Sequence, residues 1–152
     1  MSTTLDRPAR KLFLSHLLSC RQCAQSSKTT VQSQDPSVSK IWTAECEERS
    51  VEFSMLSVQG VVIETRDNGD SILIDDTTAV ALVKGCSKIP FHASTPAKGQ
   101  YLMIIGQLVR PGSIPMIRPV KIQNLSHNLA LTAMWPLEVM DGLNQDSSAA
   151  GC

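Results

Sequence analysis

The residues best suited to chemistry are two cysteines and a histidine near the N-terminus. Cys20 and Cys23 form a C-x-x-C motif, and His16 precedes it by one helical turn. Thiolate and imidazole groups at this spacing could begin a zinc site. A structural zinc site needs four ligands, however, and the sequence has no second C-x-x-C and no H-x₃-H motif. We therefore expect no metal at this position.

A second candidate is the adjacent pair Asp75 and Asp76, whose carboxylates could bind a metal or act as a general acid–base pair. The two residues begin a turn-forming run that continues to Thr78, and no histidine lies near them in the sequence. The chain also lacks a glycine-rich phosphate loop, a G-x-S-x-G motif and a hydrolase-like grouping of Ser, His and Asp. We expect no catalytic residues, no cofactor and no enzymatic activity.

The overall composition favours a single uncharged domain. The 152 residues include 14 Lys and Arg against 14 Asp and Glu, which gives a formal net charge of zero. The chain therefore lacks the positive field that supplies most non-specific affinity for nucleic-acid phosphates. No run of about 18 apolar residues predicts a membrane span, and the polar N-terminus has no signal-peptide core, which favours an intracellular protein. Five cysteines at irregular spacing fit reduced thiols.

Five strand-like runs, separated by turn signals, predict the fold. Asn68-Gly69 predicts a type I′ turn between the first two runs, and Gly60 is where a curved first strand would tolerate a bulge. A helical segment that opens near Ser126 follows the last run. This pattern is typical of an all-β fold with a C-terminal helix, a five-stranded barrel of the oligonucleotide/oligosaccharide-binding (OB) type. The five runs are residues 51–65, 71–75, 79–84, 99–109 and 115–125.

The flanking segments predict four regions along the chain. Residues 1–24 form an N-terminal arm, in which Leu14, Leu17 and Leu18 would share one face of a short helix or of an extended segment that packs on the barrel. Residues 25–40 are rich in Ser, Thr and Gln and predict a flexible linker. We expect the OB-fold domain at residues 41–144 and a disordered tail at residues 145–152.

The second and third predicted strands argue against direct nucleic-acid binding. OB barrels that bind single strands stack bases on aromatic side chains, and each stacked base contributes about 1–3 kcal/mol. Here these strands read SILID and AVALVK, with no aromatic residue and one lysine. The alternative function, a single-stranded nucleic-acid-binding OB protein, is therefore supported by the fold alone.

The C-terminal helix is apolar on nearly all sides and favours a protein partner. One stripe of the helix contains Leu129, Ala133, Leu137 and Met140, and an adjoining stripe contains Leu131, Met134, Trp135 and Val139. One small barrel can cover only one side of such a helix. The strand at residues 99–109 is apolar on both faces and also needs an outer cover. The alternative, a helix folded wholly onto its own barrel, stays open.

Several of these runs resemble one protein family. The sequence GQYLMIIG at residues 99–106, followed by Val120-Lys121-Ile122, Leu125-Ser126 and Met134-Trp135, is similar to the RecQ-mediated genome instability protein 2 family. The resemblance implies a non-catalytic OB-fold subunit that heterodimerises with a sister RecQ-mediated genome instability OB protein. Through that sister, it implies a complex with topoisomerase III-alpha and a Bloom-type helicase in the nucleus, which acts in homologous recombination, double Holliday junction dissolution, and DNA replication and repair.

The resemblance also implies the partner-binding residues. Lys121 matches a family lysine associated with complex assembly, and Met134, Trp135 and Val139 match the terminal helix; Leu131 shares their stripe and completes the predicted set. The chain departs from the family pattern at Pro136, which predicts that the helix is kinked or restarts there, because proline removes a helical hydrogen bond. A second departure is Gln100, where the family has a lysine.

Overall fold

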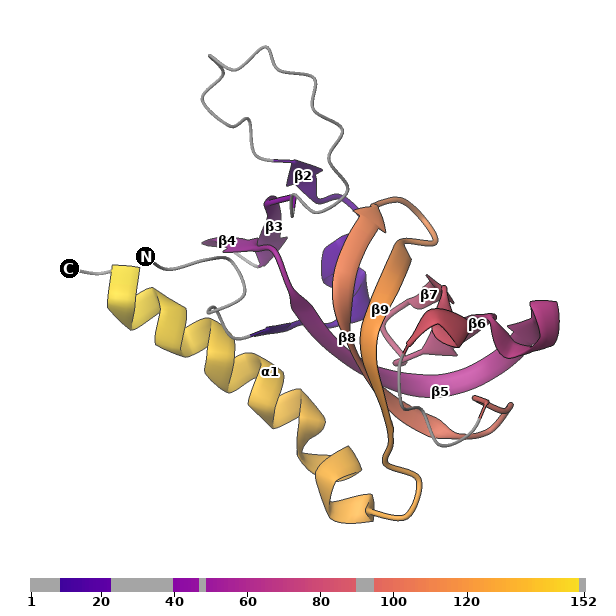
Figure 1. Ribbon diagram of the computed structural model, residues 1–152. Helices are drawn as coiled ribbons and strands as arrows, with labels where there is room; N and C mark the ends of the chain where they lie inside the picture. The colour runs from indigo at the N-terminus through magenta and orange to yellow at the C-terminus, as the bar shows by residue number, and fades with distance from the viewer. Residues whose placement is uncertain (1–8, 23–39, 47–48, 90–94, 151–152) are drawn as a thin grey trace, which may run out of the picture.

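Alternating apolar side chains build the five strands of a barrel. The computed structural model describes residues 9–22, 40–46, 49–89 and 95–150, with side chains as far as Leu143 (Figure 1). In β8, for example, Leu102, Ile104 and Leu108 point inward and are buried, whereas Met103, Ile105 and Gln107 are half-buried. The barrel strands are β5 (Leu56–Arg66), β6 (Ser71–Asp75), β7 (Val80–Lys84), β8 (Tyr101–Arg110) and β9 (Met116–Asn124).

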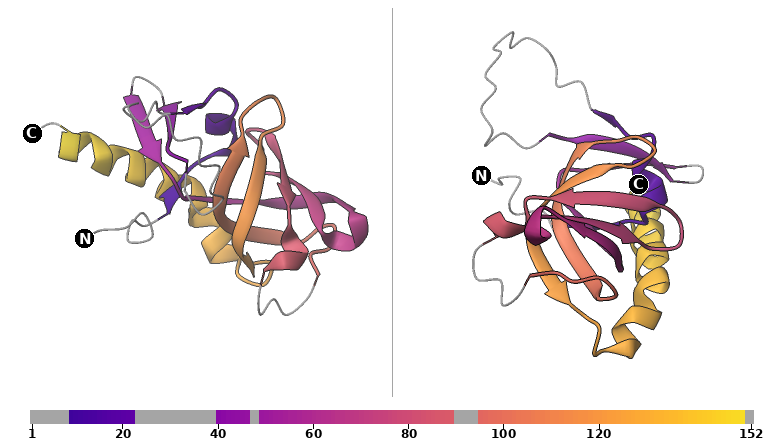
Figure 2. Two further views of the ribbon diagram at one scale, coloured as in Figure 1. Left: turned by 45° about the horizontal axis from the view of Figure 1, so that its top comes forward. Right: turned by 90° about the vertical axis from the view of Figure 1, so that its right-hand side faces the viewer.

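The pairing of these strands closes the barrel. Their order is β5-β6-β7-β9-β8, and β8 pairs back with β5. Four of the five pairings are antiparallel, and β7 pairs with β9 in parallel. The five-stranded ring, with a helix along its outside, is an OB fold, and the predicted fold class is confirmed (Figure 2).

The first predicted strand is in fact two strands. β4 (Arg49–Phe53) ends before Ser54, and β5 begins at Leu56. β4 belongs to a separate three-stranded sheet with β3 (Trp42–Cys46) and β2 (Arg21–Gln22). The sequence pattern does not show this break because Val51 and Phe53 are buried like the inward residues of β5, although they lie in the second sheet.

The turn after β5 has the predicted backbone conformation, whereas the bulge lies elsewhere. Asn68 and Gly69 have φ angles of 57° and 90°, which a type I′ turn requires, and β5 and β6 are antiparallel neighbours. The bulge lies between Val62 and Glu64, near the point where β5 leaves β8 and continues along β6. Gly60 has a different role, because a Cβ there would lie 3.0 Å from the Asp75 carbonyl oxygen.

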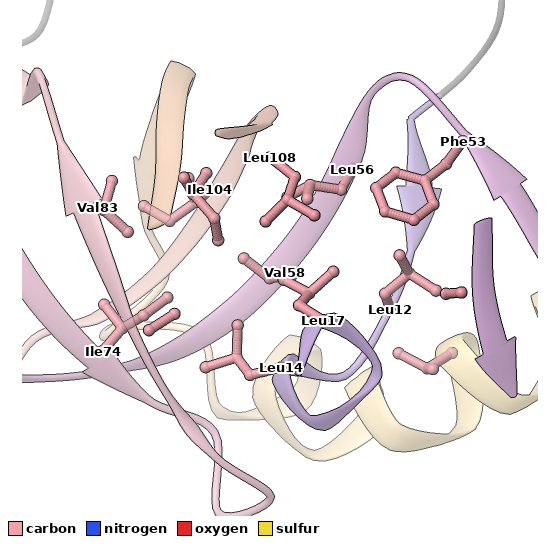
Figure 3. Packing of buried hydrophobic residues seen from close by; sticks show 14 of the residues in the cluster. Leu12, Leu14, Leu17, Phe53, Leu56, Val58, Ile74, Val83, Ile104 and Leu108 are labelled. Atoms are coloured by element: carbon pink, nitrogen blue, oxygen red, sulfur yellow. The ribbon is translucent and has the colours of Figure 1, made fainter. Parts of the chain in front are cut away.

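The N-terminal arm packs into the core. β1 (Arg10–Lys11) pairs in parallel with β5, and a 3₁₀-helix, η2 (Leu14–Leu17), follows it. Leu12, Leu14 and Leu17 are fully buried and point toward Val58 and the other core side chains (Figure 3). Leu18 was expected on the same face but is 38% exposed, because a 3₁₀-helix aligns residues three apart and so places Leu14 and Leu17 together.

The C-terminal helix α1 (Leu129–Ala150) is a single element. The Asn128 Oδ1 atom accepts a hydrogen bond from the Leu131 N–H at 3.1 Å and caps the helix, which therefore begins three residues after Ser126. The helix does not restart at Pro136 but passes through it. None of the described helices is long and apolar enough to cross a membrane.

The helix also extends beyond the predicted end of the domain. Residues 145–150, which the sequence assigned to a disordered tail, are helical. No Pro or Gly interrupts residues 143–150, and two alanines, the best helix formers, end the run. The predicted linker at residues 25–40 lies outside the described residues except for Lys40, and the predicted domain limits stay predictions.

Candidate functional site

One stripe of α1 packs on the rest of the chain. Trp135, Val139 and Leu143, spaced four residues apart, are 3%, 0% and 7% exposed and belong to the main core. We call these three residues the inner stripe. The helix contacts β1 and β4 on this side. Two polar contacts fix its position: the Lys11 Nζ atom lies 3.0 Å from Glu138 Oε1, and the Arg49 Nη1 atom donates to the Leu143 carbonyl oxygen at 3.2 Å.

The opposite side of α1 is apolar and exposed to solvent. Leu129 and Leu137 are 79% and 70% exposed, and Met140 lies on the same stripe. We call the exposed apolar residues of the helix the outer stripe: Leu129, Leu131, Ala133, Met134, Leu137 and Met140. Between Leu129 and Met140 the only charged residue is Glu138, which pairs with Lys11 on the inner side. The outer stripe therefore presents three helical turns without a charge.

The outer face of β8 is also apolar. Met103 and Ile105 point away from the barrel interior and are only half-buried, in agreement with the prediction that both faces of this strand are apolar. Lys121 on β9 pairs with Ile105 and is exposed, and Val120 beside it is 51% exposed. Lys121 thus places a cation beside the apolar side chains of this face.

The structure separates the five predicted partner-binding residues into two groups. Lys121, Leu131 and Met134 are exposed and available to a partner. Trp135 and Val139 are buried in the core of their own chain, so they cannot form a docking surface in this conformation. Of the two stripes that periodicity predicts, the first is wholly exposed, whereas the second is divided between the exposed and the buried side of the helix. The orienting signals are the contacts of Lys11 with Glu138 and of Arg49 with Leu143, which join residues far apart in the sequence.

The strand face that binds oligonucleotides in many OB folds is aliphatic here. Leu73 on β6 pairs with Leu82 on β7, and Leu82 pairs with Met116 on β9. All three side chains are half-buried. The face offers aliphatic contact area but no aromatic surface on which a base could stack.

The residues that could have done chemistry have structural roles. The Cys20 Sγ atom lies 3.1 Å from the His16 carbonyl oxygen, and burial, with a smaller contribution from Cys46, raises the pKa of this thiol to about 12. Cys20 is therefore a neutral thiol at physiological pH. Cys23 lies outside the described residues. Among the residues that the structure describes, no three His, Cys, Asp or Glu side chains lie close enough together to hold a metal ion.

Asp76 anchors the N-terminal arm. Its Oδ1 atom accepts hydrogen bonds from the Thr78 and Ala79 N–H groups at 2.9 and 3.2 Å, which form the turn between β6 and β7. Its Oδ2 atom accepts from the Leu14 N–H at 2.8 Å. The Thr78 Oγ1 atom accepts from the Ser15 N–H at 3.1 Å. Asp76 and Thr78 therefore fasten the arm to the barrel.

Comparison with known proteins identifies the family. A family model described as RecQ-mediated genome instability protein 2 matches residues 8–143. The chain belongs to this family. Two proteins of that name are similar to it: one from Gallus gallus is 30% identical over 83 residues, which are 54% of this chain and 61% of the relative. One from Mus musculus is 28% identical over 91 residues, which are 60% of each chain. The chain spans about 60% of the length of the relatives that it matches.

Solved structures support the fold of this member of the RecQ-mediated genome instability protein 2 family. A chain of the S. pombe Stn1–Ten1 complex superposes with a TM-score of 0.52 at 12% identity and covers 93% of this chain and 95% of its own. The telomere capping protein Ten1 from S. pombe gives a TM-score of 0.51 at 13% identity and covers 92% and 99%. With the family match, these likenesses support the OB fold of this chain.

Proposed function

We propose that this chain is a non-catalytic OB-fold subunit that heterodimerises with a sister RecQ-mediated genome instability OB protein. The observation that carries the proposal is the outer stripe of α1, an uncharged apolar helix face that its own barrel leaves exposed. Met and Leu residues on a continuous exposed face are typical of protein interfaces rather than of free surfaces.

The outer stripe favours a partner helix. Full burial of a Leu or Met side chain gains about 1.5–3 kcal/mol, so the side chains of Leu129, Met134, Leu137 and Met140 together could support a stable complex. Ala133 lies among these larger residues and leaves room for a second helix to approach at about 8–10 Å between axes. Lys121 and the half-buried residues of β8 form a second surface on the barrel that the same partner could contact.

Within the proposed heterodimer, this chain acts as a scaffold. Through its sister it joins topoisomerase III-alpha and a Bloom-type helicase in the nucleus, where the complex serves homologous recombination, double Holliday junction dissolution, and DNA replication and repair. Family membership supports this role. The structural neighbour from S. pombe is one chain of a Stn1–Ten1 complex, in keeping with an OB fold that works in a pair.

Co-expression with the sister protein tests the proposal. We expect a one-to-one complex by size-exclusion chromatography with light scattering, and we expect Leu137→Glu to abolish it, because the substitution places a charge in the middle of the outer stripe. Ile114→Glu is the matched control, since Ile114 is 50% exposed in the turn between β8 and β9, at the opposite end of β8 from the start of α1. A Leu137→Glu chain that binds its sister as tightly as wild type would overturn the proposal.

A binding measurement separates this function from the alternative. The isolated chain should bind single-stranded DNA weakly at physiological salt, because it has zero net charge and its β6–β7 face carries aliphatic side chains. Fluorescence anisotropy with a labelled oligonucleotide measures this affinity. Micromolar binding with a steep salt dependence would favour a direct nucleic-acid-binding role.

A further inference from the structure

The connection between β7 and β8 contains a motif that has no role in the proposed heterodimer. It reads Thr95-Pro96-Ala97-Lys98, and Thr95 is the only Ser or Thr in the 152-residue sequence that a proline directly follows. We propose that Thr95 is a phosphorylation site for a proline-directed protein kinase. Because proline has no N–H, it fits a kinase pocket in which the N–H of any other residue would be left unpaired. Lys98 supplies a cation three residues after the hydroxyl, where an acidic group of the kinase can pair with it.

The fold presents this motif in an accessible form. Thr95, Ala97 and Lys98 are exposed, and residues 95–97 belong to no helix or strand. A turn follows, in which the Gln100 N–H donates to the Ala97 carbonyl oxygen at 3.2 Å and Gly99 has a φ of 92°. A kinase could therefore engage the four residues without unfolding a barrel strand.

Thr95 also contacts a second loop, so phosphorylation would have a structural consequence. A Cβ built on Gly69 would lie 2.0 Å from the Thr95 Cγ2 atom, which shows that the threonine methyl group occupies the space above this buried glycine. Gly69 lies in the turn from Asp67 to Asp70, which joins β5 and β6. The methyl group, rather than the hydroxyl, packs against that turn.

The turn that Thr95 contacts carries acidic side chains, and two lysines, Lys84 and Lys88, lie near one of them, Asp70. Hydrogen bonds from Ser87 hold the pKa of Asp70 below its usual value, so its carboxylate is ionised at neutral pH, and Asp67 carries a second carboxylate. A phosphothreonine adds about −1.5 to −2 charges and three oxygens to a side chain whose methyl group packs on this turn. The size and hydration of the phosphate, together with the carboxylates of the turn, should separate residues 95–98 from the turn and loosen the end of the β5–β6 hairpin.

The chemical step balances with ATP as the co-substrate. The Thr95 Oγ1 atom attacks the γ-phosphorus of ATP and forms the new O–P bond, while the bond from that phosphorus to the β,γ-bridging oxygen breaks. ADP leaves with the electron pair of that bond, and the hydroxyl proton passes to the catalytic aspartate of the kinase.

Incubation of the full chain with a purified cyclin-dependent kinase and ATP tests the site. We expect one phosphate on Thr95 by mass spectrometry, and none on the Thr95→Ala chain. Lys98→Ala should lower the kcat/KM of phosphorylation about tenfold, because one charge-assisted contact is lost. Thr65→Ala is the matched control, since Thr65 is exposed on β5 and is followed by Arg66. Failure of the folded chain to accept phosphate, or equal phosphorylation of Thr95→Ala, would overturn the proposal.

Amide hydrogen exchange tests the structural consequence. Exchange at Asp67–Asp70 should become several-fold faster in the phosphorylated chain, while the amides of β8 that pair with β5 keep their protection. Unchanged exchange throughout the turn would overturn the inferred loosening of the hairpin end.

Discussion

The two stripes of α1 have similar side chains and opposite surroundings. Trp135, Val139 and Leu143 are buried against the arm and the barrel, whereas Leu137 and Met140, on the same turns of the helix, face solvent. Polar contacts with β1 and β4 fix the inner side. The comparison shows that the apolar content of a helix indicates how much surface must be covered, while its few polar contacts indicate which side faces its own chain.

The largest expected effect concerns the inner stripe. Trp135→Ala should lower the free energy of unfolding by about 3–5 kcal/mol, because it opens a cavity in the core beneath the helix. Guanidinium chloride denaturation measures this change, and Met134→Ala, at a neighbouring position that is 51% exposed, is the control. Equal stability of the two variants would mean that the inner stripe does not hold the fold.

Substitutions in the outer stripe should change the stability of the fold little and should weaken binding to the sister protein. Leu137→Ala should change the free energy of unfolding by no more than about 0.5 kcal/mol, because the side chain is 70% exposed. Its affinity for the sister protein should fall about 30-fold, as expected for a central interface residue. Isothermal titration calorimetry measures the affinity. A large loss of stability with unchanged affinity would reverse the assignment of the two stripes.

Lys121 should have a smaller effect on binding. Lys121→Ala should weaken sister binding about five-fold and leave the melting temperature unchanged, because the side chain is an exposed cation on the outer face of β9. Surface plasmon resonance at two salt concentrations checks this expectation. Lys121→Arg keeps the charge and should retain most of the affinity; equal loss in both variants would argue against an electrostatic role.

The smallest expected effect is a loss of stability at high pH, caused by the ionisation of Tyr101. Burial, together with the Asp76 and Glu138 carboxylates, raises the pKa of Tyr101 to about 12, and Tyr101 is the only tyrosine in the chain. The folded chain therefore keeps a proton that the unfolded chain releases, so the free energy of unfolding should fall as the pH rises from 10 to 12.

Tyrosinate absorbance at high pH measures this titration. Glu138→Gln should lower the pKa of Tyr101, because it removes one nearby negative charge from the inner side of α1, while burial keeps the pKa above 10. Asp141→Asn, at an exposed position of the helix, is the control. A Tyr101 pKa that does not respond to Glu138→Gln would show that the helix does not lie over this tyrosine in solution.

Local patterns were sufficient to predict the barrel. The strand-like runs of β8 and β9 and the Asn68-Gly69 turn each depend on residues close in sequence, and these features are confirmed. The second sheet was missed because its strands depend on pairing between distant segments, such as Arg21 with Thr43. Burial of Val51 looks the same in either sheet, so periodicity alone could not divide the first predicted strand.

The sequence predicted the type of binding surface but not all of the residues that form it. The sequence showed an apolar helix that one barrel could not cover, and the exposed Leu137 agrees with that expectation. It did not show that Trp135 faces inward, because the choice between stripes depends on the packing of Lys11 and Arg49 from the other end of the chain. A large aromatic side chain suits an interface and a core equally well, and only its neighbours distinguish the two.

The contact between the two ends of the chain has a kinetic consequence. Lys11 and Glu138 are 127 residues apart in sequence, and the arm that carries Lys11 lies between α1 and the β5 edge. Closing so long a loop costs conformational entropy before the contact can stabilise the fold. The arm and the helix should therefore dock only after the barrel has formed. The contact between the arm and α1 should also open first during unfolding. The rate of this opening then determines how often Trp135 is exposed to solvent.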